Sequence, residues 1–593
     1  MRINGNAFFR SASFAGEVNF LDSYISGRAD FAGAEFKSKD KGVSFYDAKI
    51  MGDVSFWSAR FAGEVSFNFV KINGLLRFGG TQFNSMDKPV SFDGAQIEGA
   101  AFFSEEIDRT LHFATFAGEA RFIGLRIGSQ AHFKGVRFNN RDKPVSFDGV
   151  KIDGFAFFSQ ALFEGEGSFS AAHFSSEANF LGAVFKKRIA FTGAKFDSDA
   201  LFSIPGLPAA RCEGEATFTG VCIGGHASFV GTVFQGPTIF ETAEIFGDAR
   251  FHGAQFLKGS QPSFTGSQFR HGAFFQGAEF HDEVSFSTAQ FEGQARFDGA
   301  TFAEKANFGA SRFAGFAYFG RSEEWQGTRF SDVLFHHARF GQDARFEDAV
   351  FQGDVNFSET SFRTVFFSLD GRAQGIEQFQ KAMDLRGCTY DRIQVDWRSL
   401  LRRRDGKVRI NPYDRQPYAQ LERIFRAMGQ DRVADKVYLE RRRVERQRMF
   451  IQAPLSWLGD SLYKWIANYG VRPYRLIFFS ALVLLLGTGT FSQRQAVSLK
   501  SDKTKTDLPV TIDWSVPEAL ALSINQFLPV EVPVGSQYAP SDKSVEVRIW
   551  LGQACSLNFE LPAAVVATFL RLAGWILVPV GVAALTGLLR VKP

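Results

Sequence analysis

The spacing of large apolar residues in the first two-thirds of the chain constrains its fold more than any other feature. An α-helix would place such residues three or four positions apart, and a half-buried strand would place them two apart. Here a Phe or Ile recurs at steps that alternate between five and six residues: Ile3, Phe9, Phe14, Phe20, Ile25, Phe31 and Phe36. About five residues make one side of a solenoid turn, so the spacing predicts a solenoid with these side chains pointing inward.

The residues between the large apolar positions fit the sides and corners of a turn. The local pattern is F-x-G-x-[AV]-x-F-x-x-A-x-F, as in residues 61–67 and 295–302. The small residue two places before a Phe, such as Ala59 before Phe61, also faces inward. Gly and polar residues take the corners, where φ can be positive. The repeat thus explains why Phe, with 71 copies, and Gly, with 57, are so abundant in the chain.

The isoleucines set the size of one turn. Ile replaces Phe at steps of 22 residues, lengthened to 25 or 30 where residues are inserted, as from Ile97 to Ile127. We therefore expect turns of four sides, and about 16 of them between Ile3 and Phe367. At roughly 4.8 Å per turn the rod would be about 75 Å long. No capping element precedes Ile3, so we expect either that this end pairs with a second copy or that the natural start lies upstream.

Insertions interrupt the repeat at one corner of alternate turns. Nine residues instead of six separate Phe36 from Phe45, Phe83 from Phe92 and Phe138 from Phe147, and residues 257–264 fall in the same register. Insertions on one face of a solenoid often form its binding face, although drift at a neutral position or recent duplication would also give this pattern. The first three insertions share an Asp-Lys pair, which we predict to contact a protein partner: Asp40 and Lys41, Asp87 and Lys88, Asp142 and Lys143.

Residues 3–370 resemble the pentapeptide-repeat proteins, specifically the Phe-rich subgroup, because the phase of the Phe positions holds over dozens of units. The resemblance implies a right-handed quadrilateral β-helix for the first domain, residues 1–370. It also implies an alternative function, since some soluble relatives are DNA mimics that bind a topoisomerase. Residues 1–370 are net acidic, but the acids are spread thinly and form no stripe. Nucleic acid itself is not an expected partner.

Residues 371–455 are predicted to form a basic cap on the β-helix. Residues 374–383 predict a short helix, and residues 385–393 predict a last repeat-like strand. Residues 418–450 predict a helical hairpin that turns at Gly429 and resembles a single tetratricopeptide-type hairpin. Five arginines shortly before the membrane segment are candidate contacts for anionic lipid headgroups, with a solvated helix face paired to acids as the alternative. They are Arg441, Arg442, Arg443, Arg446 and Arg448.

Residues 456–593 predict a membrane region with two transmembrane helices. The apolar runs 476–492 and 572–589 are long enough to span a bilayer, with Trp465 and Arg571 among their flanking anchors. The basic residues cluster before the first run. The positive-inside rule therefore places the β-helix and both termini in the cytoplasm, and residues 494–560 beyond the inner membrane. Repeat, cap and two spans together also resemble a bacterial membrane subgroup of pentapeptide-repeat proteins.

A short apolar helix between the spans, within residues 515–533, introduces a second function class. Ser523, Asn525 and Gln526 are its candidate pore segment. Two spans with a short helix between them resemble the pore domain of two-helix potassium channels, although no TVGYG-type filter follows the helix. An amphipathic segment in the outer leaflet, or one packed on the spans, is the other interpretation. A channel would require a homo-oligomer, whereas a membrane tether would not.

No pattern in the sequence points to catalysis, a cofactor or a metal. The nine His residues are scattered, and the adjacent His336 and His337 would face opposite sides of a strand. The four Cys residues lack metal-ligand spacing, and no H-E-x-x-H, P-loop or G-x-S-x-G motif is present. We therefore expect a non-enzymatic, membrane-anchored scaffold without a cofactor, whose partners are membrane lipid and an unidentified protein.

Overall fold

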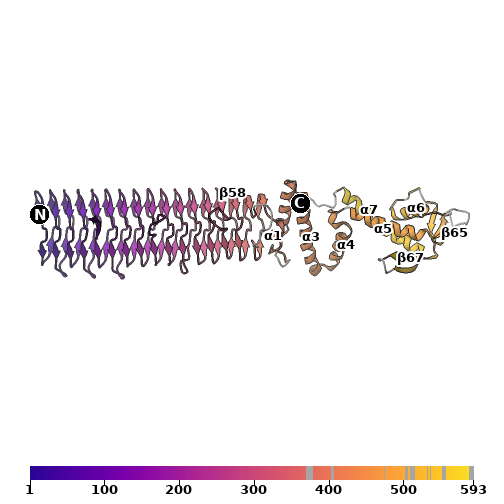
Figure 1. Cartoon of the computed structure of the whole chain (residues 1–593), viewed down its shortest axis with the longest axis horizontal. Coiled ribbons are helices and arrows are strands. Elements are labelled where there is room, and N and C mark those ends of the chain that lie inside the picture. The colour runs from indigo at the N-terminus through magenta and orange to yellow at the C-terminus, as the bar shows by residue number, and fades with distance from the viewer. Residues whose placement is uncertain are drawn as a thin grey trace. The chain divides into compact units, whose positions relative to one another are not determined.

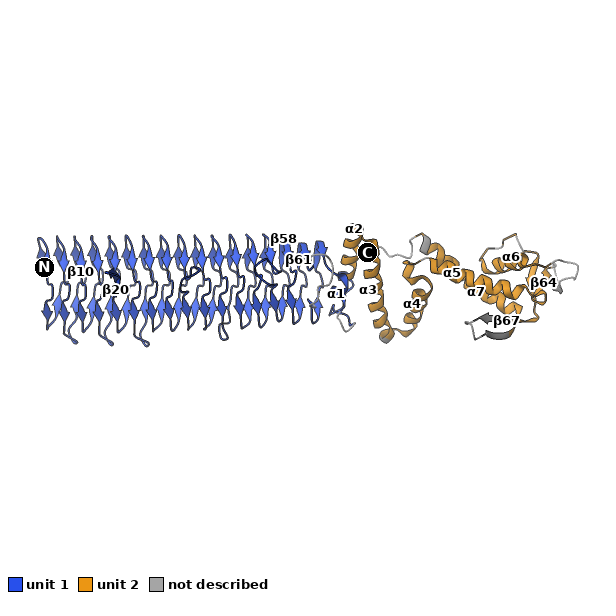
Figure 2. Cartoon of the chain, viewed as in Figure 1, with its two compact units in different colours: residues 1–417 blue, residues 418–593 orange. Residues whose placement is uncertain are grey.

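The computed structural model forms two compact units, residues 1–417 and residues 418–593 (Figure 2). Each unit is described by itself. The residues that the structure describes are 1–368, 378–402, 407–472, 474–500, 505–507, 514–530, 532–533, 536–550 and 556–586.

The first unit is a parallel β-solenoid of about 17 turns, which runs from β1 (Arg2–Ile3) to β63 (Thr389–Gln394) (Figure 1). Each strand pairs in parallel with the strand one turn later, so that Ile25 lies opposite Ile50. Within a turn, two strands belong to a 31-stranded sheet, one to a 15-stranded sheet and one to a 10-stranded sheet that a 5-stranded sheet continues. One such turn consists of β5 (Tyr24–Ile25), β6 (Ala29–Asp30), β7 (Glu35–Phe36) and β8 (Val43–Ser44). The predicted β-solenoid is confirmed.

The core of the solenoid is a set of parallel stacks of Phe rings. Phe180 is buried and stacks on Phe158 and Phe202 of the neighbouring turns, with ring centroids 5.1 and 4.9 Å apart. It also meets the rings of Phe169 and Phe191 edge to face, at 5.6 and 5.3 Å. Burying one such ring contributes about 1.5–3 kcal/mol, and aromatic pairs add to this. The five-residue spacing therefore produces a continuous aromatic core along the solenoid.

The stacked core of the solenoid continues beyond residue 370, where a short helix was predicted. Phe379 stacks on Phe351 at 4.9 Å, and β62 (Met383–Asp384) pairs with β60 (Val355–Asn356). Residues 378–383 therefore extend the solenoid instead of forming the predicted short helix, because Phe379 and Met383 supply the inward side chains of another turn. Residues 374–377, the start of that predicted helix, lie outside the described residues. The predicted last strand at residues 385–393 corresponds to β63.

Helices follow the last strands. Helix α1 (Trp397–Leu401) belongs to the first unit, and α2 (Gln416–Ala427) begins at its end. The predicted helical hairpin is formed by α2 and α3 (Asp431–Gln452), with a positive φ at Gly429 in the turn. Helix α4 (Pro454–Ala467) and the 3₁₀ turn η1 (Asn468–Gly470) then lead toward the apolar helices.

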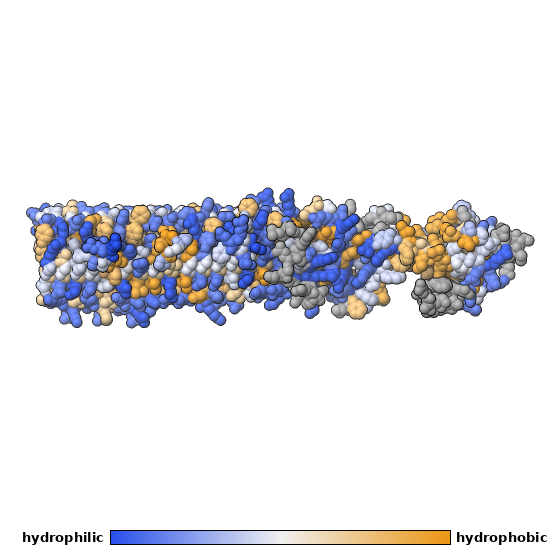
Figure 3. Space-filling model, viewed as in Figure 1, coloured by the Kyte–Doolittle hydropathy of each residue, from blue (hydrophilic) through white to orange (hydrophobic). Residues whose placement is uncertain are grey.

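The apolar part of the second unit is a three-helix cluster. Helices α5 (Tyr474–Phe491), α6 (Val516–Phe527) and α7 (Ala563–Leu585) pack on one another around Leu522, Phe527, Val566 and Leu570. Figure 3 shows hydrophobic residues concentrated over α5 and α7, whereas hydrophilic and hydrophobic residues are mixed along the solenoid. Between these helices lie η2 (Arg494–Ala496), β64 (Val497–Lys500), β65 (Lys505–Asp507), β66 (Tyr538–Pro540), β67 (Ser544–Trp550) and β68 (Ser556–Pro562).

Two helices are long and apolar enough to cross a membrane, over Tyr474–Phe491 and Ala563–Ala583. The first matches the predicted span. The second begins earlier than predicted, so Arg571 lies inside the helix and does not flank it. From its position inside α7, Arg571 makes a polar contact with α6: its Nε donates to Oε1 of Gln526 at 2.9 Å.

Candidate functional site

The three insertions with an Asp-Lys pair lie at one corner of the solenoid. Each connects a strand of the 15-stranded sheet to a strand of the 10-stranded sheet, and they occur in alternate turns. We call residues 37–42, 84–89 and 139–144 the Asp-Lys loops. They join β7 to β8, β15 (Gln82–Phe83) to β16 (Val90–Ser91), and β25 (Arg137–Phe138) to β26 (Val145–Ser146).

A glycine of the following turn supports each Asp-Lys loop. A Cβ built on Gly63, Gly118 or Gly165 would contact loop carbonyl oxygens, among them those of Ser38, Ser85 and Asn140. Any larger residue would push the loop outward. A glutamate follows each of these glycines. Its backbone carbonyl accepts a hydrogen bond from the amide of the first strand residue after the loop. These glutamates are Glu64, Glu119 and Glu166.

The Asp-Lys loops also share internal hydrogen bonds. The backbone amides of Lys41 and Lys88 donate to the hydroxyls of Ser38 and Ser85, both at 3.0 Å. In the third loop the amide of Asp142 donates instead to Oδ1 of Asn140 at 2.9 Å. Nδ2 of Asn140 donates to the carbonyl of Met86 at 3.4 Å, which connects the third loop to the second. Hydrogen bonds of the loop residues therefore fix the conformation of each loop.

The charged side chains of the loops are accessible. All six predicted contact residues are exposed. Among them only Asp142 makes an ion pair, at 3.7 Å from Lys187, within the part of the chain that the structure describes. The fourth insertion, residues 257–262, differs: the amides of Gly259 and Gln261 donate to the carboxylate of Asp282. Its corner is thus capped by an acid of the next turn.

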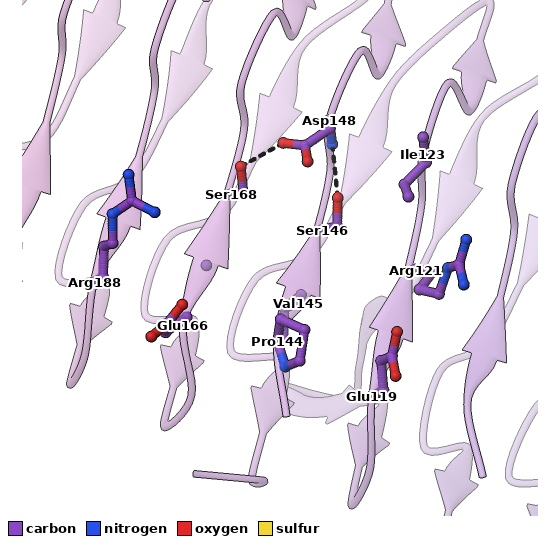
Figure 4. Close-up of a pocket in the computed structure, with 11 residues that line it drawn as sticks. Glu119, Arg121, Ile123, Pro144, Val145, Ser146, Asp148, Glu166, Ser168 and Arg188 are labelled. Atoms are coloured by element: carbon purple, nitrogen blue, oxygen red, sulfur yellow. Dashed lines mark hydrogen bonds between the residues drawn. The ribbon is translucent and has the colours of Figure 1, made fainter. Parts of the chain in front are cut away.

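A shallow cavity of about 280 Å³ lies beside the third Asp-Lys loop, on the outer face of the 10-stranded sheet (Figure 4). Asp148 accepts hydrogen bonds from the hydroxyl of Ser168 and, at 2.9 Å, from the amide of Ser170. Two arginines line the cavity and are already paired, Arg121 with Asp93 at 2.7 Å and Arg188 with Glu215 at 3.3 Å. The cavity offers hydroxyl and carboxylate groups to a polar partner.

A second row of insertions was not predicted. These insertions lie at a second corner, where the chain enters a strand of the 15-stranded sheet. They are the hairpin of β19 (Ser104–Ile107) and β20 (Thr110–Phe113), residues 203–209 and residues 320–327. The indole of Trp325 lies where a Cβ on Gly277 or Gly299 would stand. The step of 30 residues from Ile97 to Ile127 was the available signal for the hairpin, and the 13 residues from Phe103 to Phe116 give its place.

Some acidic residues of the solenoid pair with cations of neighbouring turns. Arg60 lies 3.5 Å from Glu35, Lys186 lies 3.0 Å from Glu213, and Arg270 contacts both Glu244 and Glu292. These pairs place cations among the acids of neighbouring turns, whereas a DNA mimic would need a continuous anionic surface.

The predicted lipid-contacting arginines fall into two groups. Arg441 is buried, with Nη1 3.8 Å from Glu422, and Nη2 of Arg442 lies 2.6 Å from Asp460 of α4. Both side chains therefore serve the packing of the helices and are not directed to a lipid surface. Arg443 and Arg446 are partly exposed and Arg448 is exposed, so these three remain candidates for headgroup contacts.

The candidate pore residues lie on the packed side of α6. Ser523 is fully buried, and its hydroxyl accepts from Thr488 of α5 at 3.5 Å. Gln526 is 7% exposed and bonds Arg571, while Oδ1 of Asn525 accepts from the amide of Val532 at 3.1 Å. Within a single chain, Ser523 joins α6 to α5 and Gln526 joins it to α7, whereas Asn525 holds the segment that follows α6.

The described residues include no group of three or more His, Cys, Asp or Glu side chains that could hold a metal ion. Burial raises the pKa of the Cys212 and Cys388 thiols to about 12, which leaves both protonated and unreactive at neutral pH.

No family model matches this chain, and neither a curated protein nor a solved structure does.

Proposed function

We propose that the protein is a non-enzymatic, membrane-anchored scaffold that binds a protein partner through its Asp-Lys loops. The observation that supports this proposal most is the repetition of one charged loop, seated on a glycine, in alternate turns of one corner. Exposed Asp and Lys side chains with a nearby Glu favour a polar partner surface that carries charges of both signs. Within the described residues, five of the six side chains make no ion pair, so they are available to such a surface.

The proposal includes the architecture and class of the solenoid. We assign it to the Phe-rich pentapeptide-repeat proteins, with a right-handed, quadrilateral β-helix. Four short strands per turn and inward Phe stacks support the assignment. A regular rod with repeated charged corners suits the binding of a partner along its length.

We place the protein in the inner membrane, with α5 and α7 as the spans and the solenoid and both termini in the cytoplasm. The length and apolar character of the two helices support membrane insertion. The basic residues that precede α5 support the orientation through the positive-inside rule.

The test is co-purification of the full-length protein from membranes after replacement of all three Asp-Lys loops by Gly-Ser. We expect the loss of the partner, identified by cross-linking and mass spectrometry. Replacement of residues 257–262 is the matched control, because this insertion occupies the same corner without the Asp-Lys pair. Retention of every partner by the triple variant would exclude the loops as the binding face.

A channel is the second candidate, and the position of α6 between the two apolar helices supports it. Gly574 of α7 lies directly against the carbonyl of Phe527, so the end of α6 approaches the interior of the second apolar helix. In an oligomer of about four chains, a short helix inserted between two spans would lie beside a central pore. A strictly monomeric protein in detergent would end this candidate. If conductance is found in bilayers, Gln526→Arg should alter it.

A further inference from the structure

Helix α4 (Pro454–Ala467) carries an apolar stripe that nothing in the described structure covers. Leu455, Leu458, Leu462 and Trp465 are 83, 57, 51 and 64% exposed. Their spacing of three, four and three residues places them on one face of the helix. Four large apolar side chains on one short helix are too exposed for a helix that faces only water.

The opposite face of α4 is fixed to the rest of its unit. Asp460 accepts from Nη2 of Arg442 at 2.6 Å and from the hydroxyl of Tyr469 at 2.7 Å. The ring of Tyr463 meets Tyr469 at 5.4 Å, and Ala467 is fully buried. These contacts fix the rotation of the helix about its axis, so the apolar stripe is held outward by the fold.

The stripe continues onto the first apolar helix. The indole of Trp465 lies 4.6 Å from the ring of Phe479, which is near the N-terminal end of α5. Ile477 and Phe478 of the same end are both 65% exposed. The C-terminal end of α4 is therefore at the level where α5 would enter the bilayer, and Trp is the residue type that favours this depth.

Basic residues lie on the packed side of α4 and not beside the stripe. Lys464 is one helical turn after Asp460, and it lies near Arg443 and Arg446 of α3. The apolar side chains of the stripe are therefore the groups that suit the interface of a membrane.

We propose that α4 is an in-plane membrane helix whose stripe of Leu455, Leu458, Leu462 and Trp465 is buried at the boundary between headgroups and acyl chains. The leaflet is the one that α5 enters at its N-terminus. This inference rests on the proposed crossing of the membrane by α5. It assigns a lipid surface to a helix that the two spans alone do not explain, and it fixes the height of the α3–α4 region above the bilayer.

The test uses the full-length protein in nanodiscs that contain anionic lipid, with the four native cysteines replaced by alanine. One new cysteine carries an environment-sensitive fluorophore at Leu458→Cys, or at Ser456→Cys as the matched control on the fixed face. Lipids with a nitroxide near the carbonyl end or near the methyl end of the acyl chain report depth. We expect strong quenching at position 458 by the shallow nitroxide, weaker quenching by the deep one, and none at position 456.

A label at Leu482→Cys separates the inference from the proposal that it rests on, because Leu482 lies in the middle of α5 and is exposed. Quenching at 482 by the deep nitroxide with no quenching at 458 would leave the membrane tether intact and overturn the role of α4. No lipid quenching at 482 would overturn both. A further sample carries the nitroxide on Leu458→Cys of a second copy of the protein and not on lipid. Quenching at 458 in that sample alone would show that the stripe is an interface between chains, which also overturns the inference.

A second measurement needs no cysteine replacement. In nanodiscs, the amides of α4 in the native sequence should exchange slowly with deuterium. Leu458→Asp together with Leu462→Asp should lose this protection, whereas Ser456→Asp should keep it. Equal exchange in the double variant and the native chain would count against burial of the stripe in lipid.

Discussion

The solenoid and the apolar helices of the second unit are stabilised in different ways. In the solenoid each contact recurs one turn later: Phe275 stacks on Phe251 at 4.8 Å and on Phe297 at 4.9 Å, and each of those rings repeats the arrangement. In the second unit the contacts are unique, such as the seat of Phe527 on Gly574 or the hydrogen bond from Arg571 to Gln526. Repetition spreads stability over many equivalent sites, whereas the second unit depends on a few close approaches.

The largest effect should come from the inward ring of one turn. Phe275→Ala removes a fully buried side chain from the stack and should lower the free energy of unfolding by about 3–5 kcal/mol. Phe274→Ala is the matched control, because Phe274 is the adjacent residue but points outward, with His252 as its ring partner. Its cost should stay below about 1 kcal/mol. Urea denaturation followed by circular dichroism measures both, and equal losses would contradict the assignment of inward and outward faces.

The unique contacts of the second unit should be sensitive to a single methyl group. Gly574→Ala places a Cβ against the carbonyl of Phe527, which should cost about 1–3 kcal/mol and separate α6 from α7. Gly489→Ala is the control, because nothing lies within 4 Å of a Cβ at that position of α5. The thermal unfolding of the detergent-solubilised protein distinguishes the two variants. A lower melting temperature for Gly489→Ala than for Gly574→Ala would show that α6 does not pack as described.

This difference also explains how much could be predicted from the sequence. A ring at every fifth or sixth residue is repeated dozens of times, so the solenoid, its turn length and the corner of the Asp-Lys loops followed from spacing alone. The extension through Phe379 and Met383 was missed because one irregular turn has no neighbours to confirm its phase.

The second unit shows where sequence reasoning reached less far. Hydropathy located α5, but it could not show that Arg571 lies inside α7, because the hydrogen bond to Gln526 joins residues 45 positions apart. Similarly, the run of arginines gave no sign that Arg441 and Arg442 face inward, since their acids Glu422 and Asp460 come from two other helices. The exposed stripe of α4 was readable as leucines at helical spacing, but only the packing of Asp460 shows which face is fixed.

A smaller effect should separate two glycines of the same repeat position. Gly118 supports the second Asp-Lys loop, whereas Gly16 stands in the same F-A-G-E context with no atom within 4 Å of a Cβ. Gly118→Ala should cost about 1 kcal/mol, because an exposed loop can shift, and should raise hydrogen exchange of residues 84–89. Gly16→Ala should leave exchange unchanged. If both substitutions are silent, the glycine does not position the loop.

The smallest effect should be a dependence on pH within a single turn of the solenoid. Asp30 is nearly fully buried on the outer side of β6, and burial alone would raise its pKa. Hydrogen bonds from Arg10 at 2.7 Å and from the amide of Ala32, together with the charge of Arg28, outweigh this and hold the pKa below its ordinary value. A lowered pKa means that the ionised carboxylate stabilises the fold at pH values above about 4 and that this stabilisation is lost as the pH falls through the lowered pKa.

Replacement of this carboxylate tests that sign. Asp30→Asn should lower the stability of the second turn by about 0.5–1 kcal/mol at neutral pH, since both arginines are partly exposed to solvent. The difference from the native chain should shrink as the pH falls below about 4, because the native Asp30 is then protonated as well. Hydrogen exchange of residues 29–32 at two pH values measures it, and Asp22→Asn, at an exposed corner of the same turn, is the control. A difference that grew toward acid pH would mean that burial, and not the two arginines, determines the charge state of Asp30.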